Sequence, residues 1–197
     1  MGGWGLNSSD EGRKRTMRVF LCVAPPKEEI EALSSFVASL RRYSGFKWVL
    51  PEQMHVTLKF LGESEPEAVQ RLDSELAKSG SVRAFGIKIA GAGAFPDLTR
   101  PKVIWLGVRE GAQSLAKLAE GVERAAKHAG FPADGGRFRA HLTLARARES
   151  GPLPAGLDGL LAGAPELCWQ CDRFYMIKSV LTPKGPVYTP LREYPLG

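Results

Sequence analysis

Apolar residues recur along the chain in two patterns, one typical of strands and the other of amphipathic helices. Apolar steps of three and four predict helices over 30–40, 66–76 and 115–129. Continuous or alternating apolar runs predict strands over 18–23, 54–61, 82–90, 103–108, 140–146, 167–180 and 187–194, with a short extended piece at 47–50. A loop is expected over 91–100, and the Gly-, Pro- and Ala-rich stretch 149–165 predicts no defined element.

The order of these elements indicates an α+β protein. Strand–helix–strand blocks occur in each half of the chain, which favours two similar lobes over a doubly wound parallel sheet. Gly91 and Gly93 are not followed by the third glycine of a dinucleotide-binding loop, which excludes that fold. We therefore expect one bilobal domain over 17–197 with an internal repeat. The polar, Gly-rich stretch 1–16 shows no period and predicts a flexible N-terminal tail.

Composition narrows the class of protein further. The 197 residues are 44% hydrophobic and 24% charged, as in an ordinary globular protein, and the net charge of +6 favours an anionic partner such as nucleic acid. Three cysteines, an odd number, argue against a secreted disulfide framework. The apolar run 19–24 is too short for a secretion signal, and no run approaches the roughly 18 residues that cross a bilayer. We expect a cytoplasmic protein without a membrane span.

Two of the three histidines open nearly identical tetrapeptides, HVTL from His55 and HLTL from His141, about half the chain apart. Within a strand, a histidine and the threonine two residues later share one face, while the apolar residues turn to the other. Two such strands, one per lobe, would gather two imidazoles and the hydroxyls of Thr57 and Thr143 around one cleft. Imidazoles suit acid–base chemistry near neutral pH, and hydroxyls donate hydrogen bonds to phosphate oxygens. Semi-buried histidines beside strand-forming threonines are the purely structural alternative, which the repetition disfavours.

The same motifs resemble the two-histidine phosphoesterase superfamily, and most closely its RNA 2′,3′-cyclic phosphodiesterases of the LigT/ThpR type. The resemblance runs from residue 17 to the C-terminus. It is carried by PEQMHVTLKFLGE at 51–63, FP and RP-x-VIWLGV within 95–108, FRAHLTLAR at 138–146 and KSVLTPKGPVY at 178–188. The chain departs from the family at Ala140, where proline is frequent, and at Ile177, where many relatives carry tyrosine.

The resemblance implies a bilobal, pseudo-twofold α+β fold with antiparallel sheets, outer helices and a central cleft. It also implies hydrolysis of RNA 2′,3′-cyclic phosphate ends to 2′-phosphate ends, with tRNA halves as candidate substrates. By this analogy His55 is the proton donor to the 3′ oxygen, His141 accepts a proton from water, and Thr57 and Thr143 hold the non-bridging oxygens. The pseudo-symmetry leaves the two histidine roles interchangeable on sequence alone. No metal or cofactor is required, and a monomer is expected.

Three cations are further candidates for contact with the substrate phosphate. Lys59 lies two residues past Thr57 and therefore on the His55 face of a regular strand. Arg146 matches the family but falls on the face opposite to His141 if the strand is regular, and Arg100 belongs to a loop beside a strand. Each could instead be a solvated ion-pair partner.

Several aromatic residues offer a stacking surface or a core contact. Phe46, Trp48 and Phe138 could stack a base at the mouth of the cleft, or could be ordinary core residues. The third histidine, His128, ends a predicted helix and has no threonine two residues later, so a structural role is expected.

Other chemistries are weighed against the phosphodiesterase hypothesis. Cys168 and Cys171 point to opposite faces of a strand and have no second pair to complete a zinc site. Sister activities of the superfamily remain open, namely an RNA 3′-end exonuclease or an ADP-ribose cyclic phosphodiesterase. An RNA-binding or end-joining accessory is a third possibility, although a binding module has no need of paired proton carriers.

Overall fold

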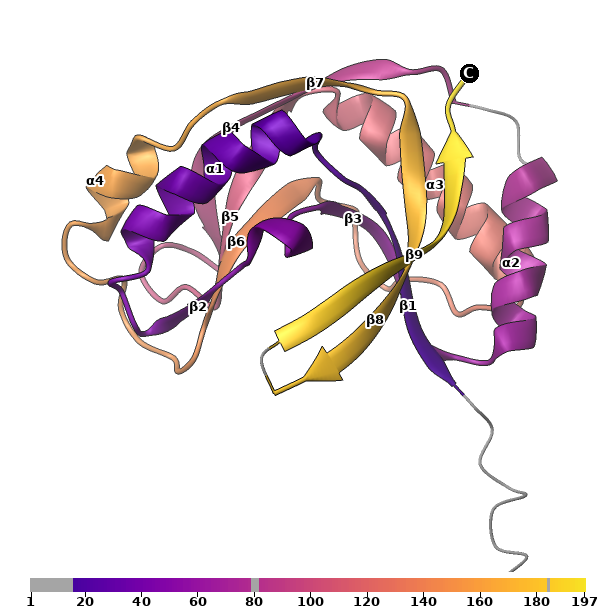
Figure 1. Ribbon diagram of the computed structural model, residues 1–197, viewed down its shortest axis with the longest axis horizontal. Helices are drawn as coiled ribbons and strands as arrows, with labels where there is room; N and C mark the ends of the chain where they lie inside the picture. Colours follow the sequence, from indigo (N-terminus) through magenta and orange to yellow (C-terminus); the bar gives the residue numbers. More distant parts are fainter. Residues whose placement is uncertain (1–15, 79–81, 184) are drawn as a thin grey trace, which may run out of the picture.

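A curved antiparallel sheet forms the framework of the protein (Figure 1), as described by a computed structural model for residues 16–78, 82–183 and 185–197. Across the described residues the sheet has nine strands in the order β7-β4-β5-β6-β3-β1-β8-β9, with β2 paired to β6 alone. The strands are β1 (Met17–Val23), β2 (Phe46–Trp48), β3 (Val56–Ser64), β4 (Phe85–Phe95), β5 (Val103–Glu110), β6 (His141–Ala147), β7 (Leu167–Cys171), β8 (Arg173–Thr182) and β9 (Gly185–Pro195).

The helices pack on the sheet through apolar faces repeated at helical spacing. They are α1 (Lys27–Leu40), α2 (Pro66–Lys78), α3 (Ala112–His128), α4 (Leu157–Ala162) and the single 3₁₀ turn η1 (Pro51–Gln53). Helices α2 and α3 contact each other at one end of the molecule, and α1 and α4 lie at the other end (Figure 1). Within the described residues, no helix is both long and apolar enough to span a membrane.

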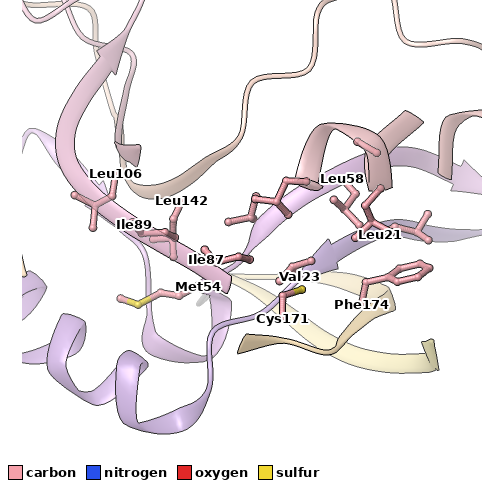
Figure 2. Close-up of a cluster of buried hydrophobic side chains, with 14 of the residues drawn as sticks. Leu21, Val23, Met54, Leu58, Ile87, Ile89, Leu106, Leu142, Cys171 and Phe174 are labelled. Atoms are coloured by element: carbon pink, nitrogen blue, oxygen red, sulfur yellow. The ribbon is translucent and has the colours of Figure 1, made fainter. Parts of the chain in front are cut away.

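One hydrophobic core runs beneath both halves of the sheet. Figure 2 shows Ile89 of β4, Leu106 of β5 and Leu142 of β6 in the same cluster as Leu21 of β1 and Leu58 of β3. Each of these side chains is at least 95% buried. Removing a buried leucine or isoleucine from such a core costs about 2–5 kcal/mol. The core therefore fixes the register of the strands that carry the histidine motifs.

The α+β class and the predicted helices are confirmed, but the predicted element boundaries need three corrections. The expected strand 167–180 is two strands, because β7 pairs with β4 while β8 pairs with β1 in the other half of the sheet. The expected loop 91–100 begins later, since β4 continues through a bulge at Gly91, whose φ is 75°. The unassigned stretch 149–165 contains α4. The predicted tail 1–16 lies outside the described residues except for Thr16, and Lys184 also lies outside them.

Candidate active site

The two histidine motifs meet at the centre of the sheet. Strands β3 and β6 are joined through one register pair, Val56 opposite Leu142, and both of these side chains are fully buried. Because the strands are antiparallel, this register directs His55 toward Thr143 and His141 toward Thr57. The bridge therefore lies at the centre of a pseudo-twofold arrangement, with four strands of the main order on each side of it and β2 added beside β6.

The four motif residues line one cleft of about 470 Å³. The cleft walls come from β1, β2, β3, β6, β8 and β9. Within the described residues, the hydroxyls of Thr57 and Thr143 form no hydrogen bond, so both are available to a ligand. The cleft thus contains the two imidazoles and two hydroxyls that the sequence predicts to converge.

Both imidazoles are fixed in the same tautomer by backbone carbonyls. Nδ1 of His55 lies 2.7 Å from the carbonyl oxygen of Gln53, and Nδ1 of His141 lies 2.7 Å from that of Arg139. A carbonyl can only accept, so each Nδ1 carries a proton and donates it. In the neutral ring the opposite nitrogen, Nε2, then has a free lone pair, so each imidazole can accept a proton there and later return it.

Aromatic rings hold each imidazole from the side. The ring centroid of His55 lies 4.8 Å from that of Phe20 and 5.6 Å from that of Tyr188. The ring centroid of His141 lies 5.1 Å from that of Phe95 and 6.4 Å from that of Trp105. The ring contacts restrict the rotation of both imidazoles.

Gly93 makes room for one of these rings. A Cβ atom at Gly93 would overlap the indole of Trp105 on the neighbouring strand β5. A larger residue at position 93 would therefore displace the indole that packs against His141.

The site favours the neutral form of both histidines in the free protein. The pKa of His55 is lowered from 6.5 to about 4, chiefly by burial and also by the positive charges of Arg146 and His141, against the effect of the hydrogen bond to Gln53. Burial also lowers the pKa of His141, and Arg146 adds to that effect. An anion bound between the rings would oppose these shifts, because it favours the charged imidazolium.

A matching β-bulge interrupts each motif strand. In β3, Thr57 pairs with Cys22 and Lys59 pairs with Leu21, so Leu58 is an extra residue. In β6, Leu144 is the extra residue between Thr143 and Ala145. A bulge reverses the alternation of faces beyond it.

The bulge in β3 overturns the expected position of Lys59. This residue is turned away from the cleft, and its side chain is only 2% exposed. Its Nζ donates to Glu123 Oε2 at 2.7 Å, Asp134 Oδ1 at 3.0 Å and the Pro132 carbonyl at 3.1 Å. The prediction that Lys59 shares the His55 face is wrong, because two-residue alternation does not hold across the bulge.

The bulge in β6 has the opposite consequence for Arg146. A regular strand would turn Arg146 away from His141, whereas the structure places it in the lining of the cleft. Its charge acts on both imidazoles. Arg100 is different: it lies in the exposed loop after β4, where its backbone N–H donates to Asp97, and it is not among the cleft-lining residues.

The aromatic residues at the cleft differ from those considered first. Phe46 is buried in the core, and Phe138 packs against the core from its edge, whereas the buried Trp48 does reach the cleft lining. Phe60 and Tyr188 are cleft residues that the sequence reasoning did not select. Aligning HVTLKF with HLTLAR would have found Phe60, because it occupies the position of Arg146 in the second motif.

The cysteines and acidic residues add no metal-binding cluster to the described part of the chain. Cys171 is buried and Cys168 is exposed, and both are free thiols. Among the residues that the structure describes, no group of three or more His, Cys, Asp or Glu side chains is arranged to hold a metal ion.

Comparison with known proteins agrees with the fold and the repeat. The family model described as LigT like Phosphoesterase matches twice, over residues 23–105 and 106–188. The chain is 35% identical to the RNA 2′,3′-cyclic phosphodiesterase of Archaeoglobus fulgidus, covering 90% of this chain and 99% of the relative. It is 34% identical to the protein of the same name from Thermus thermophilus, covering 91% and 90%.

Solved structures show the same architecture. A crystal structure of a Thermus thermophilus protein matches with a TM-score of 0.76 and 30% identity, covering 91% of this chain and 98% of that one. Escherichia coli LigT in complex with 3′-AMP also matches with a TM-score of 0.76, covering 92% and 99%; at 24% identity this supports the fold alone. From the double family match and the identity over most of its length, the chain belongs to the LigT-like phosphoesterase family.

Proposed function

We propose that the protein hydrolyses the 2′,3′-cyclic phosphate at RNA ends to a 2′-phosphate and a free 3′ hydroxyl. The observation that carries the proposal is the pair of His-x-Thr motifs facing one cleft across the Val56–Leu142 bridge. Relatives at 32–36% identity are named RNA 2′,3′-cyclic phosphodiesterases, which supports the same substrate class here.

Hydrolysis needs one proton removed and one proton delivered. Nε2 of His141 takes a proton from water while the water oxygen attacks phosphorus. The bond from phosphorus to the 3′ oxygen breaks, and Nε2 of His55 gives its proton to that oxygen. The pseudo-symmetric geometry would also serve the reverse assignment, so the roles of donor and acceptor follow the family resemblance.

The depressed pKa of His55 couples its protonation to substrate binding. With a pKa of about 4, His55 is largely neutral at pH 7 in the free protein. The negative charge of the cyclic phosphate raises the pKa of a nearby imidazole and so favours the imidazolium that acts as the acid. The donor is therefore charged chiefly in the complex, and proton delivery is linked to occupancy of the cleft.

The hydroxyls and Arg146 stabilise charge on the phosphate. Thr57 and Thr143 donate hydrogen bonds to the two non-bridging oxygens, and the Arg146 guanidinium adds a positive charge to the cleft. Such donors matter most where negative charge builds in the transition state. Proton transfer and hydrogen bonding supply each step, so the proposed reaction is metal-independent.

The proposal also covers the physiological setting. We place the protein in the cytoplasm as a monomer, with tRNA halves that end in a cyclic phosphate among its substrates. The charge of +6 supports attraction of an RNA strand.

The test is incubation of the purified protein with nucleoside 2′,3′-cyclic phosphates and separation of the two possible monophosphates. The 2′-monophosphate is the expected product. His55→Asn and His141→Asn should each abolish most turnover, and His128→Asn is the matched control outside the cleft. Accumulation of the 3′-monophosphate, or no turnover by the native protein, would overturn the proposal.

A further inference from the structure

One wall of the cleft carries two like charges directly opposite each other. Lys47 of β2 is the register partner of Arg146 of β6, and both exposed side chains line the cleft. Within the described residues neither forms an ion pair with a carboxylate. Like charges opposite each other on antiparallel strands are unfavourable, and an anion placed between them would relieve the repulsion.

Strand β2 is built to hold Lys47 in this position. Phe46 and Trp48 on either side are buried, so the alternation leaves Lys47 as the exposed residue of the strand. The indole Nε1 of Trp48 donates to the Tyr43 carbonyl at 3.2 Å, and the N–H of Val49 donates to the Leu144 carbonyl at 2.8 Å. The backbone that carries the ammonium is thus anchored on both sides.

Arg148 continues the positive charge outward from the cleft. It lies two residues past Arg146, just beyond the end of β6, and its backbone N–H donates to the Gly45 carbonyl at 2.9 Å. Its Nε donates to the Ser44 carbonyl at 3.1 Å, which holds the guanidinium beside the turn before β2. Glu149 follows in the chain but forms no ion pair with these cations in the described part of the structure. Positive charge therefore extends from Arg146 past the end of β6 to Arg148.

The opposite wall of the cleft carries exposed apolar side chains beside Arg18 of β1. Phe60 is 55% exposed and Leu181 is 66% exposed, and both line the cleft. Phe60 occupies in β3 the position that Arg146 occupies in β6, so the cleft is asymmetric although its histidines and threonines are symmetric. A ligand with phosphates along Lys47 and Arg146 and a base against Phe60 and Leu181 matches this arrangement.

We propose that Lys47 and Arg148 extend the contact at Arg146 into a phosphodiester tract, which holds the RNA strand on the 5′ side of the terminal nucleotide. The RNA then leaves the cleft over β2 and the end of β6, with its base edge toward Phe60 and Leu181. This inference rests on the proposed hydrolysis of RNA ends and adds the path of the strand.

The test compares two substrates, a nucleoside 2′,3′-cyclic phosphate and a short oligoribonucleotide with the same terminal nucleotide and a cyclic phosphate end. The first variant is the double substitution Lys47→Gln and Arg148→Gln, called the Gln pair. The second is the double substitution Lys47→Arg and Arg148→Lys, called the charge-preserving pair. Lys117→Gln, an exposed cation on α3 away from the cleft, is the matched control. Circular dichroism melting verifies that each variant is folded.

The expected readout is the ratio of kcat/KM for the oligonucleotide to that for the mononucleotide. The Gln pair should lower this ratio roughly tenfold, since an exposed charge pair contributes up to about fivefold. The salt dependence of the oligonucleotide reaction should become shallower by about 0.7 per lost contact on a double-logarithmic plot. The charge-preserving pair should restore most of the ratio, and Lys117→Gln should leave it unchanged. An unchanged ratio in the Gln pair overturns the tract.

Binding separates failure of the tract from failure of the proposed function. Fluorescence anisotropy with a 3′-phosphorylated oligoribonucleotide needs no turnover. If the native protein hydrolyses neither substrate but binds this RNA, and the Gln pair binds about tenfold more weakly, the tract stands and the proposed reaction does not. If binding is equal in the native protein and the Gln pair, the tract is refuted whatever the activity.

Discussion

Replacing Lys59 with methionine tests whether the bulge in β3 turns this side chain away from the cleft. A regular strand would place the ammonium against the substrate, whereas the structure places it behind the sheet, between Glu123 of α3 and Asp134. The substitution Lys59→Met keeps a flexible side chain of similar length and removes the charge. An ammonium against the substrate predicts that the substitution lowers activity. An ammonium behind the sheet predicts that it lowers stability.

The expected loss of stability is about 2 kcal/mol. Removing one partner of a fully buried ion pair costs about 3–5 kcal/mol, and an exposed pair contributes about 0–1 kcal/mol. Lys59 is 2% exposed, but Glu123 is 33% exposed and Asp134 is 54% exposed, so both carboxylates can be rehydrated. The value therefore falls between these limits, and it corresponds to a Tm lower by about 4–8 °C in a chain of this length.

The stabilisation by Lys59 has a defined pH dependence. Burial by itself lowers the pKa of Lys59, but the hydrogen bonds to Glu123 and Asp134 outweigh it, and the pKa lies above 10.5. A group whose pKa is higher in the folded protein than in the unfolded protein stabilises the fold. This stabilisation is fully present below the pKa of the unfolded state and is lost as pH rises through the pKa of the folded state. The difference between the native protein and Lys59→Met should therefore persist at about pH 7–9 and shrink above pH 10.5.

The assay is urea unfolding of Lys59→Met, Asp134→Asn and the double variant, with kcat/KM measured on the same samples at a temperature where all are folded. Coupling between the two substitutions is expected, since their atoms are 3.0 Å apart. Lys78→Met is the matched control, because Lys78 is also 3.0 Å from a carboxylate but is 71% exposed. A drop in kcat/KM for Lys59→Met with an unchanged free energy of unfolding would refute the position behind the sheet and indicate that Lys59 contacts the substrate.

The remaining predictions concern the proposed hydrolysis. His55→Ala and His141→Ala should each lower kcat about 10²–10⁴-fold, which is the usual contribution of a positioned acid or base. His128→Ala should change kcat little. Equal losses in all three variants, measured by steady-state kinetics, would contradict the pairing of His55 with His141. Hydrolysis should survive EDTA, and a loss that zinc or magnesium restores would refute the metal-independent scheme. The profile of kcat/KM against pH should be bell-shaped with its maximum below 6.5, because burial lowers both imidazole pKa values in the free protein. The maximum of kcat should lie at higher pH, because the bound phosphate raises both values; a flat profile with chemistry rate-limiting would exclude paired imidazole catalysis.

The sequence predicted the parts of the site that depend on repetition and alternation. His55, Thr57, His141 and Thr143 repeat as a pair, and a two-residue step within a short strand is enough to place each pair on one face. The apolar residues between them become the buried bridge of Val56 and Leu142. These placements need no information from distant residues.

The strand pairings of 167–180 depended on distant residues and could not be predicted. Strand-forming residues occupy most of this stretch, yet β7 pairs with β4 and β8 pairs with β1. The division at Asp172 reflects which neighbours are available on each side of the sheet, and that information lies in residues far away in the chain.

The two bulges explain why the sequence misplaced the cations on the motif strands. In each motif strand the leucine that follows the threonine is an extra residue, so Lys59 turns to the core side and Arg146 turns into the cleft. Bulges re-aim side chains beside active sites, and here the same device acts in both lobes with different residues at the re-aimed positions. Phe60 occupies the cleft position in β3 and Arg146 the equivalent position in β6. The repeat thus makes the two histidine–threonine pairs symmetric, while the residues at this pair of positions differ between the two walls of the cleft, and under the proposed function this difference would orient the RNA end.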